Sequence, residues 1–176
     1  PAPDMLPLME SDPNIETAVI DPLGTQGWLR PNHLHFPFDN PKARQALVHA
    51  VNQETYLQAI IGNPKLYKAC AAYFICGTPN ETDVGTEALK NVDLEKAKQL
   101  LKESGYNGEK IILMQPTDIP VLNGASLVTA QLLRDIGMDV EVQAMDWSTL
   151  TSRRAEKKSP ADGGWNIFHT YSTGAD

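Results

Sequence analysis

Apolar residues recur at helical spacing in several stretches of the chain, and capping and stop residues bound these stretches. In the clearest case Asp39-Asn40-Pro41 supplies an N-cap and a proline for the first turn, and apolar positions follow at helical intervals as far as Val51. After a break near Asn52-Gln53 the pattern resumes and stops at Gly62. This stretch predicts one amphipathic helix or two in succession.

The second half of the chain alternates between helical and strand-like patterns. Asp93 caps a helix that is expected to end at Gly105, and a continuous apolar run over residues 111–114 predicts a strand covered on both faces. The expected elements continue with a helix closed by Gly137, a strand over residues 140–144, a helix from Trp147 to about Lys157 and a strand over residues 165–171. Helices placed between strands favour an α/β lobe.

The first part of the chain is less regular. Residues 1–27 contain five prolines, and the apolar run over residues 17–20 predicts a single short strand there. A second strand is expected over residues 28–34. We therefore divide the chain into a loop-rich crossing with short strands, residues 1–35, and the α/β lobe, residues 36–176.

Composition narrows the function classes. Hydrophobic residues make up 41% and charged residues 21% of the chain, as in globular domains, and no apolar stretch approaches the roughly 20 residues that span a bilayer. The formal net charge of -7 argues against a nucleic-acid partner, because phosphate binding needs clustered Lys and Arg. The sequence lacks phosphate-binding Gly-rich loops, nucleophile elbows and HExxH motifs, so we expect no enzyme, metal or cofactor.

Residues 63–92 form a long irregular connection that contains both cysteines. The five-residue gap between Cys70 and Cys76 suits a disulfide-closed loop better than a zinc site, which would require further ligands. A disulfide would place the protein in an oxidising compartment. Two unrelated buried thiols remain the alternative.

Aromatic residues cluster near the C-terminal end of the chain, where they could line a cleft that encloses a ligand. The cluster consists of Trp147, Trp165, Phe168 and Tyr171. We expect Trp147 and Phe168 in the core. Trp165 and Tyr171 are left open as ligand-binding residues.

The string PFDNPKARQALVHAVNQE, residues 37–54, resembles the signature of the family 5 solute-binding proteins of dipeptide, oligopeptide and nickel transport, usually met as PFDNxxVRQAxxxAIDRE. The departures are mild, with Ala43 where Val is common and Asn52-Gln53 in place of Asp-Arg. Residues 93–106 are similar to the family's DxxKAKxLLxEAGY helix, and residues 127–147 are similar to a further family stretch. The resemblance therefore covers nearly the whole chain.

This resemblance implies a periplasmic-binding-protein type II-like lobe, an α/β fold with a mixed sheet and flanking helices, here incomplete. Within the signature, Arg44 is expected to pair with a neighbouring carboxylate and hold its helix in register. The chain is expected to be a fragment of the C-terminal lobe of a two-lobed protein that closes over its ligand. The resemblance identifies the signature as structural rather than ligand-binding.

The resemblance also implies partners and a location. The ligand would be a small-molecule or peptide solute, delivered to the membrane permease of an ABC importer, and the protein would be a monomer. Because the chain begins at Pro1 with no charged segment and apolar region ahead of the fold, we expect a signal peptide to be removed. The expected location is periplasmic or extracellular, with a lipoprotein anchor as one form of it.

Ligand contacts are carried over from the resemblance residue by residue. Peptide-binding members place an Asp after a Gly-Trp pair, where it meets the ligand's amino group; Asp176 is the candidate, and Tyr171 replaces the Trp. Dipeptide-binding members place an Arg after the strand that matches residues 111–114, whereas Asp118 stands near that position here. Asp118 would repel a free carboxylate and favour an amide, a longer peptide or a cationic solute. Trp165 completes the predicted ligand-binding set.

Two alternatives to a peptide carrier remain open. A hydrolase or other small-molecule enzyme would need Cys70 as nucleophile with His49 or His169 as base, although no third residue orients such a pair. A metal or metal-chelate carrier of the same family would make His33, His49 or His169 relevant.

Overall fold

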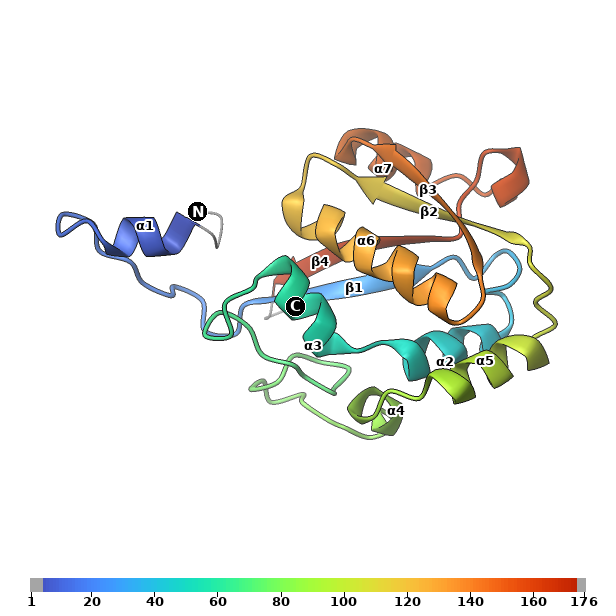
Figure 1. Cartoon of the computed structure of the whole chain (residues 1–176), viewed down its shortest axis with the longest axis horizontal. Coiled ribbons are helices and arrows are strands. Elements are labelled where there is room, and N and C mark those ends of the chain that lie inside the picture. The colour runs from blue at the N-terminus through green and yellow to red at the C-terminus, as the bar shows by residue number, and fades with distance from the viewer. Residues whose placement is uncertain (1–4, 174–176) are drawn as a thin grey trace.

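A four-stranded mixed sheet forms the centre of the structure, a computed structural model that describes residues 5–173 (Figure 1). The strands are β1 (Thr25–Pro31), β2 (Lys110–Pro116), β3 (Asp139–Met145) and β4 (Ile167–Thr173), in the order β1-β4-β2-β3. Strand β2 runs parallel to both β3 and β4, and β1 runs antiparallel to β4. The mixed sheet with its flanking helices confirms the predicted α/β class.

Helices flank the sheet and its lower side in Figure 1, except α1, which lies apart from the sheet. They are α1 (Leu6–Glu10), α2 (Pro41–Ala50), α3 (Gln53–Ile60), α4 (Glu87–Lys90), α5 (Leu94–Glu103), α6 (Pro120–Asp135) and α7 (Trp147–Arg153), with a 3-10 turn η2 (Pro160–Asp162). Helix α6 contacts β2, β3 and β4, whereas α7 contacts β2. None of the helices within residues 5–173 is long and apolar enough to cross a membrane.

Strand β2 supplies side chains to two separate hydrophobic cores. Ile111 and Leu113 point into the main core, where they meet α2, α5 and α6. Met114 points to the opposite face and packs with Leu150 of α7 and Phe168 of β4. Successive side chains of a strand alternate between its faces, so the continuous apolar run of β2 is what allows helices to cover both sides.

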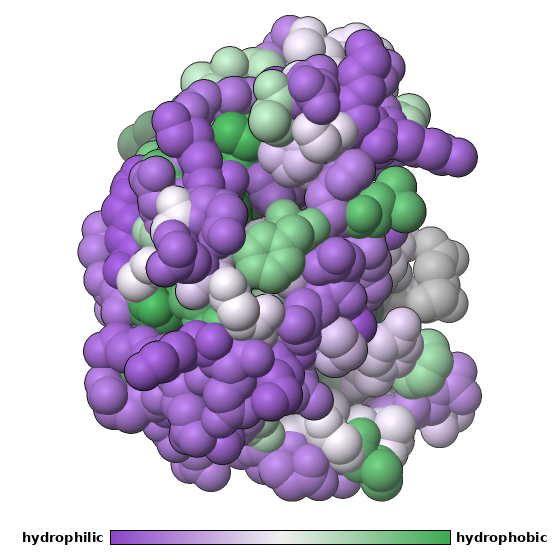
Figure 2. Space-filling view, turned by 90° about the vertical axis from the view of Figure 1, so that its right-hand side faces the viewer, coloured by the Kyte–Doolittle hydropathy of each residue, from purple (hydrophilic) through white to green (hydrophobic). Residues whose placement is uncertain are grey.

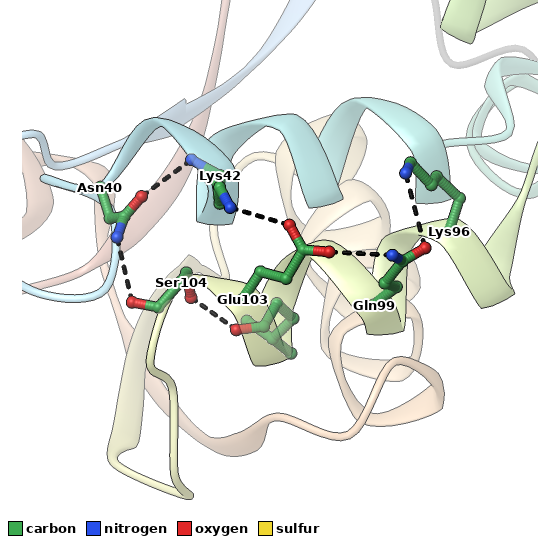
Figure 3. A network of polar contacts seen from close by, with 7 residues as sticks. Asn40, Lys42, Lys96, Gln99, Glu103 and Ser104 are labelled. Carbon is green, nitrogen blue, oxygen red and sulfur yellow. Dashed lines mark hydrogen bonds and ion pairs between the residues drawn. The ribbon is translucent and has the colours of Figure 1, made fainter.

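Helices α2 and α5 lie side by side, and polar contacts join their ends (Figure 3). The Asn40 side chain accepts a hydrogen bond from the backbone N–H of Lys42 at 2.9 Å and donates one to the carbonyl of Ser104 at 3.0 Å. Lys42 also pairs with Glu103 at 2.8 Å, and Gln99 donates to the same carboxylate. Asn40 thus caps α2 and fixes the end of α5. Its position before Pro41 predicts the capping role.

Arg44 does not pair with a carboxylate, so that prediction is wrong. Its guanidinium donates to the backbone carbonyls of Phe38 at 2.7 Å and Asp39 at 3.0 Å. These carbonyls belong to the turn that precedes α2. Arg44 therefore holds the turn against the helix through backbone carbonyls.

Three predicted elements differ from the structure. Residues 17–20 form no strand, because the sheet offers them no partner within the described chain; Ile20 is 96% exposed. Strand β1 starts three residues earlier than expected and ends at Pro31; beyond it, the side chain of Asn32 donates to the carbonyl of Trp165 at 3.0 Å. Helix α7 ends at Arg153 rather than near Lys157.

Replacing Asn40 by Ala is expected to lower the free energy of unfolding by about 1–2 kcal/mol, because both an N-cap bond and a bond to the Ser104 carbonyl are lost. Urea denaturation of the protein measures this. The matched control is Lys42→Met, which removes an exposed ion pair and keeps the capped backbone N–H; it should cause no measurable loss. Equal losses in the two variants would contradict the capping role.

Candidate functional site

The carboxyl ends of the parallel strands gather at one edge of the sheet, on the left in Figure 1. Because β1 is antiparallel to β4, its first residues lie at the same edge. We call this region the carboxyl edge: the residues after β2 and β3, the last residues of β4 and the first of β1. Open α/β sheets bind ligands outside the carboxyl ends of their strands, so this edge is the candidate site.

The opposite edge offers less. Figure 2 views the molecule from the side of the amino ends of β2 and β4, and its surface is mostly hydrophilic, with apolar side chains scattered singly. Buried polar side chains close the sheet there: Asn166 exchanges hydrogen bonds with the backbone of Ile112, at 2.8 and 3.0 Å. The amino edge is therefore filled by the chain itself.

Asp118 lies at the carboxyl edge, directly beyond β2. Its Oδ1 accepts a hydrogen bond from the backbone N–H of Trp147, the first residue of α7, at 2.9 Å. Beside it the backbone N–H of Thr117 donates to the carbonyl of Met145 at 2.9 Å. Asp118 thus helps to join the ends of β2 and β3, and the side chain itself is exposed.

Tyr171 lies at the same edge, near the end of β4. It is 47% exposed and stands opposite Gly27 of β1, which has no side chain to cover the ring. Within the described residues the pairing of β2 with β4 stops at Met114 and Phe168, so the carboxyl ends of these neighbouring strands part beyond that point. The structure therefore brings Asp118 and Tyr171 to one open edge.

Trp165 lies elsewhere. It is 8% exposed and packs edge-on against Phe168, with ring centroids 5.0 Å apart, in the core beneath α7. Its indole Nε1 is buried without a hydrogen-bond partner among the described residues. Trp165 precedes β4, and at about 3.3 Å per extended residue it lies roughly 20 Å along the chain from Tyr171. Asp176 lies outside the described residues, and the ligand role of all four residues stays a prediction.

A disulfide joins Cys70 to Cys76, as predicted. The side-chain amide of Gln53 holds the loop's first residue through two hydrogen bonds, donating to the Cys70 carbonyl at 2.8 Å and accepting from its N–H at 2.7 Å. With its sulfur in the bridge, Cys70 has no thiolate to act as a nucleophile. The enzyme alternative that relied on Cys70 with His49 or His169 therefore loses its nucleophile.

The disulfide loop reaches the carboxyl edge through β1. The side chain of Gln26 donates to the carbonyl of Tyr73 at 3.3 Å and accepts from the indole N–H of Trp28 at 2.8 Å. Sequence reasoning missed these residues, although the cysteine spacing pointed to the loop. The spacing gives no information on which strand the loop meets.

A buried chain of polar side chains lies behind this edge and joins three elements. The Tyr56 hydroxyl of α3 lies 2.7 Å from Thr129 Oγ1 of α6, which lies 2.6 Å from His169 Nε2 of β4. The His169 ring also hydrogen-bonds the backbone of Trp28.

Burial sets the charge of this chain. Desolvation lowers the pKa of His169 to about 4, and the hydrogen bond to the Trp28 backbone opposes the shift. Desolvation likewise raises the pKa of Tyr56 to about 12, while the hydrogen bond to Thr129 opposes it. Both His169 and Tyr56 are therefore neutral near pH 7. His169 acts as a structural hydrogen-bonding group.

Other features lie away from the carboxyl edge. A hollow of about 510 Å³ lies between the start of α3 and the segment that leads into α5, and none of the predicted site residues lines it. Within residues 5–173 no three His, Cys, Asp or Glu side chains gather as metal ligands. His35 contacts the carbonyl of Lys157 at 3.0 Å, and His169 is buried in the polar chain.

A sequence model described as bacterial extracellular solute-binding proteins, family 5 Middle, matches residues 1–174. The chain belongs to this family. The match spans both the signature helix α2 and the strands that form the carboxyl edge. The family resemblance that the sequence pattern indicates is thereby confirmed.

The chain is also similar to two relatives and shares its fold with one solved structure. The probable peptide ABC transporter periplasmic-binding protein y4tO of Sinorhizobium fredii is 45% identical over 171 residues, 97% of this chain and 32% of the relative. The glutathione-binding protein GsiB of Escherichia coli is 31% identical over 169 residues, 93% of this chain and 31% of the relative. The crystal structure of the ABC transporter substrate binding protein CtaP from Listeria monocytogenes shares the fold, with a TM-score of 0.82 at 20% identity, covering 98% of this chain and 34% of CtaP.

The chain thus spans about a third of the length of these family 5 proteins. This fits the prediction that it is part of a longer protein. The matched third contains a sheet open at its carboxyl edge.

The buried His169 predicts a pH dependence with a definite sign. The unfolded chain binds a proton near pH 6.5, whereas folded His169 does so only near pH 4, so stability is full above pH 6.5 and is lost as the pH falls through this window. Between pH 7 and pH 5 the full-length protein should lose about 2 kcal/mol more unfolding free energy than its His169→Gln variant. Denaturant titrations at both pH values measure this, and equal losses would contradict a depressed His169 pKa.

Proposed function

We propose that the chain is part of a solute-binding protein that captures a peptide or related small solute at the carboxyl edge and passes it to the permease of an ABC importer. The observation that carries the proposal is the family match over residues 1–174, combined with an edge where β2 and β4 part and Tyr171 stands exposed. The names of the relatives support the same class, since they include a probable peptide transporter component and a glutathione-binding protein.

In this proposal residues 36–176 form part of the C-terminal lobe, and residues 1–35 form the crossing that leads into it. The other lobe would close over the carboxyl edge and remove water from the solute. Capture of this kind requires no nucleophile or general base, so the protein would bind without chemistry. It would act as a monomer in the periplasm or at the outer cell surface, with a lipoprotein anchor as one means of retention.

The chemistry of the edge favours a solute with a positive group near Asp118. One oxygen of this carboxylate accepts from the Trp147 backbone, which leaves the second oxygen for a ligand. An amino terminus or a cationic side chain fits this acceptor, whereas a free carboxylate would be repelled. Tyr171 would add a ring surface. Asp176 stays in the proposal from sequence alone, and the buried position of Trp165 favours a packing role over direct contact.

The proposed function is tested on the full-length protein with a panel of di- and tripeptides. A binding protein gains melting temperature with its ligand through mass action and leaves the ligand intact. We expect at least one peptide to raise the melting temperature and to be recovered unchanged by mass spectrometry. Binding of none of the peptides would overturn the proposed solute class, and their hydrolysis would overturn the binding role.

Asp118 provides a sharper test, because the Asp118→Asn variant keeps an oxygen for the Trp147 N–H and replaces the second, charged acceptor oxygen by an NH2 donor. Its affinity for peptides with a free amino terminus should fall roughly tenfold, the effect of losing a charge-assisted hydrogen bond worth about 1.5 kcal/mol. Isothermal titration calorimetry with N-acetylated peptides as the control should show a smaller change. Affinity retained in both Asp118→Asn and Asp118→Ala would exclude Asp118 from the site.

A further inference from the structure

Two aromatic side chains project from the disulfide loop. Tyr73 is 76% exposed and Phe74 is 42% exposed, and their rings form an edge-on pair with centroids 5.1 Å apart. Both lie inside the ring that Cys70 and Cys76 close. Aromatic rings usually bury most of their surface, so a pair held outward on a closed loop points to a contact made with something else.

Hydrogen bonds fix the backbone of this loop at three places. Gln53 holds both backbone groups of Cys70, and the hydroxyl of Thr86 donates to the carbonyl of Ala71 at 2.7 Å. Gln26 donates to the carbonyl of Tyr73 itself. Ordering a contact surface in advance lowers the entropy lost on binding, which makes the loop suited to recognition.

The loop is continuous with the carboxyl edge. Gln26 belongs to β1 and pairs with Ser172 of β4, the residue next to Tyr171. The same amide accepts from the indole of Trp28, which lies on the face of β1 that carries Gln26 and is itself partly exposed. Gln26 therefore links Trp28 to the backbone of the loop that carries Tyr73 and Phe74, and we call these three exposed aromatic residues the aromatic patch.

We propose that the aromatic patch binds an apolar or aromatic side chain of the solute and thereby sets side-chain preference. The proposal deepens the proposed function and rests on it, because it assigns a specificity surface to the same edge. Asp118 would attract the positive group of the solute, and the aromatic patch would select the side chain beside it. Stacked and edge-on rings favour such a partner beyond the area they bury.

The rest of the full-length protein is the competing occupant of this surface. If another part of the protein packed on Tyr73 and Phe74, removing the rings would lower the melting temperature of the ligand-free protein, because buried apolar area would be lost. If the solute is the occupant, the melting temperature without solute stays unchanged. The two occupants are therefore separated by stability measured without peptide and affinity measured with it.

The test uses the full-length protein with the tripeptides Ala-Phe-Ala and Ala-Ala-Ala in isothermal titration calorimetry. The Tyr73→Ala/Phe74→Ala variant should bind Ala-Phe-Ala roughly tenfold more weakly and Ala-Ala-Ala within about twofold of the parent. Tyr73→Phe should retain the parent's preference, since it keeps the ring. Leu127→Ala, which trims an exposed apolar side chain on α6, is the matched control and should change neither affinity.

Each outcome decides between the proposals. Loss of the Phe preference with an unchanged ligand-free melting temperature supports the aromatic patch. An unchanged preference, or a lower melting temperature without a change in preference, overturns the aromatic patch and leaves the proposed function standing. If the parent binds neither tripeptide but binds another peptide of the panel, the aromatic patch is overturned and the proposed function stands; if it binds no peptide of the panel, both are overturned.

Discussion

Burial of β2 on both faces is the constraint on which the rest of the chain depends. Successive side chains of a strand point to opposite faces of the sheet, so an uninterrupted apolar run needs a hydrophobic core on each face. Leu113 packs in the main core, and Met114 packs in the second one. The connections that follow β2 and β3 then carry α6 to one face and α7 to the other. Helices that cover opposite faces leave the carboxyl ends of the strands uncovered between them.

Polar side chains join neighbouring strands at the amino ends of β2 and β4. Asn166 is almost fully buried, and it bonds the backbone of Ile112 on one side while its carbonyl accepts from the N–H of Asn32 on the other. These bonds extend the pairing of the backbone beyond the point where β4 begins. At the other end, the pairing of β2 with β4 stops at Met114 and Phe168. The same sheet is thus tied at one end and open at the other.

Local signals predicted most of the helix and strand positions, and non-local contacts explain the failures. Asn40, Asp93 and Asp146 each cap a helix as their position before an apolar pattern indicates, since a cap needs only residues within one turn. Residues 17–20 have the composition of a strand, but a strand also needs a partner, and none is available in the described sheet. Trp165 and Tyr171 are near each other in sequence, but the extended backbone places Trp165 before the amino end of β4 and Tyr171 near its carboxyl end.

The contacts that give the carboxyl edge its chemistry are the least visible in sequence. Gln26 and Tyr73 are 47 residues apart, and Thr129 and His169 are 40 apart, so no periodicity connects them. A family signature fixes the helix at residues 41–50, whose contacts are with α5 and the preceding turn, and it is silent on the loop that carries the exposed rings. The signals that identify the family therefore lie in local caps and buried strands, whereas the side chains of the carboxyl edge are brought together only by the folded sheet.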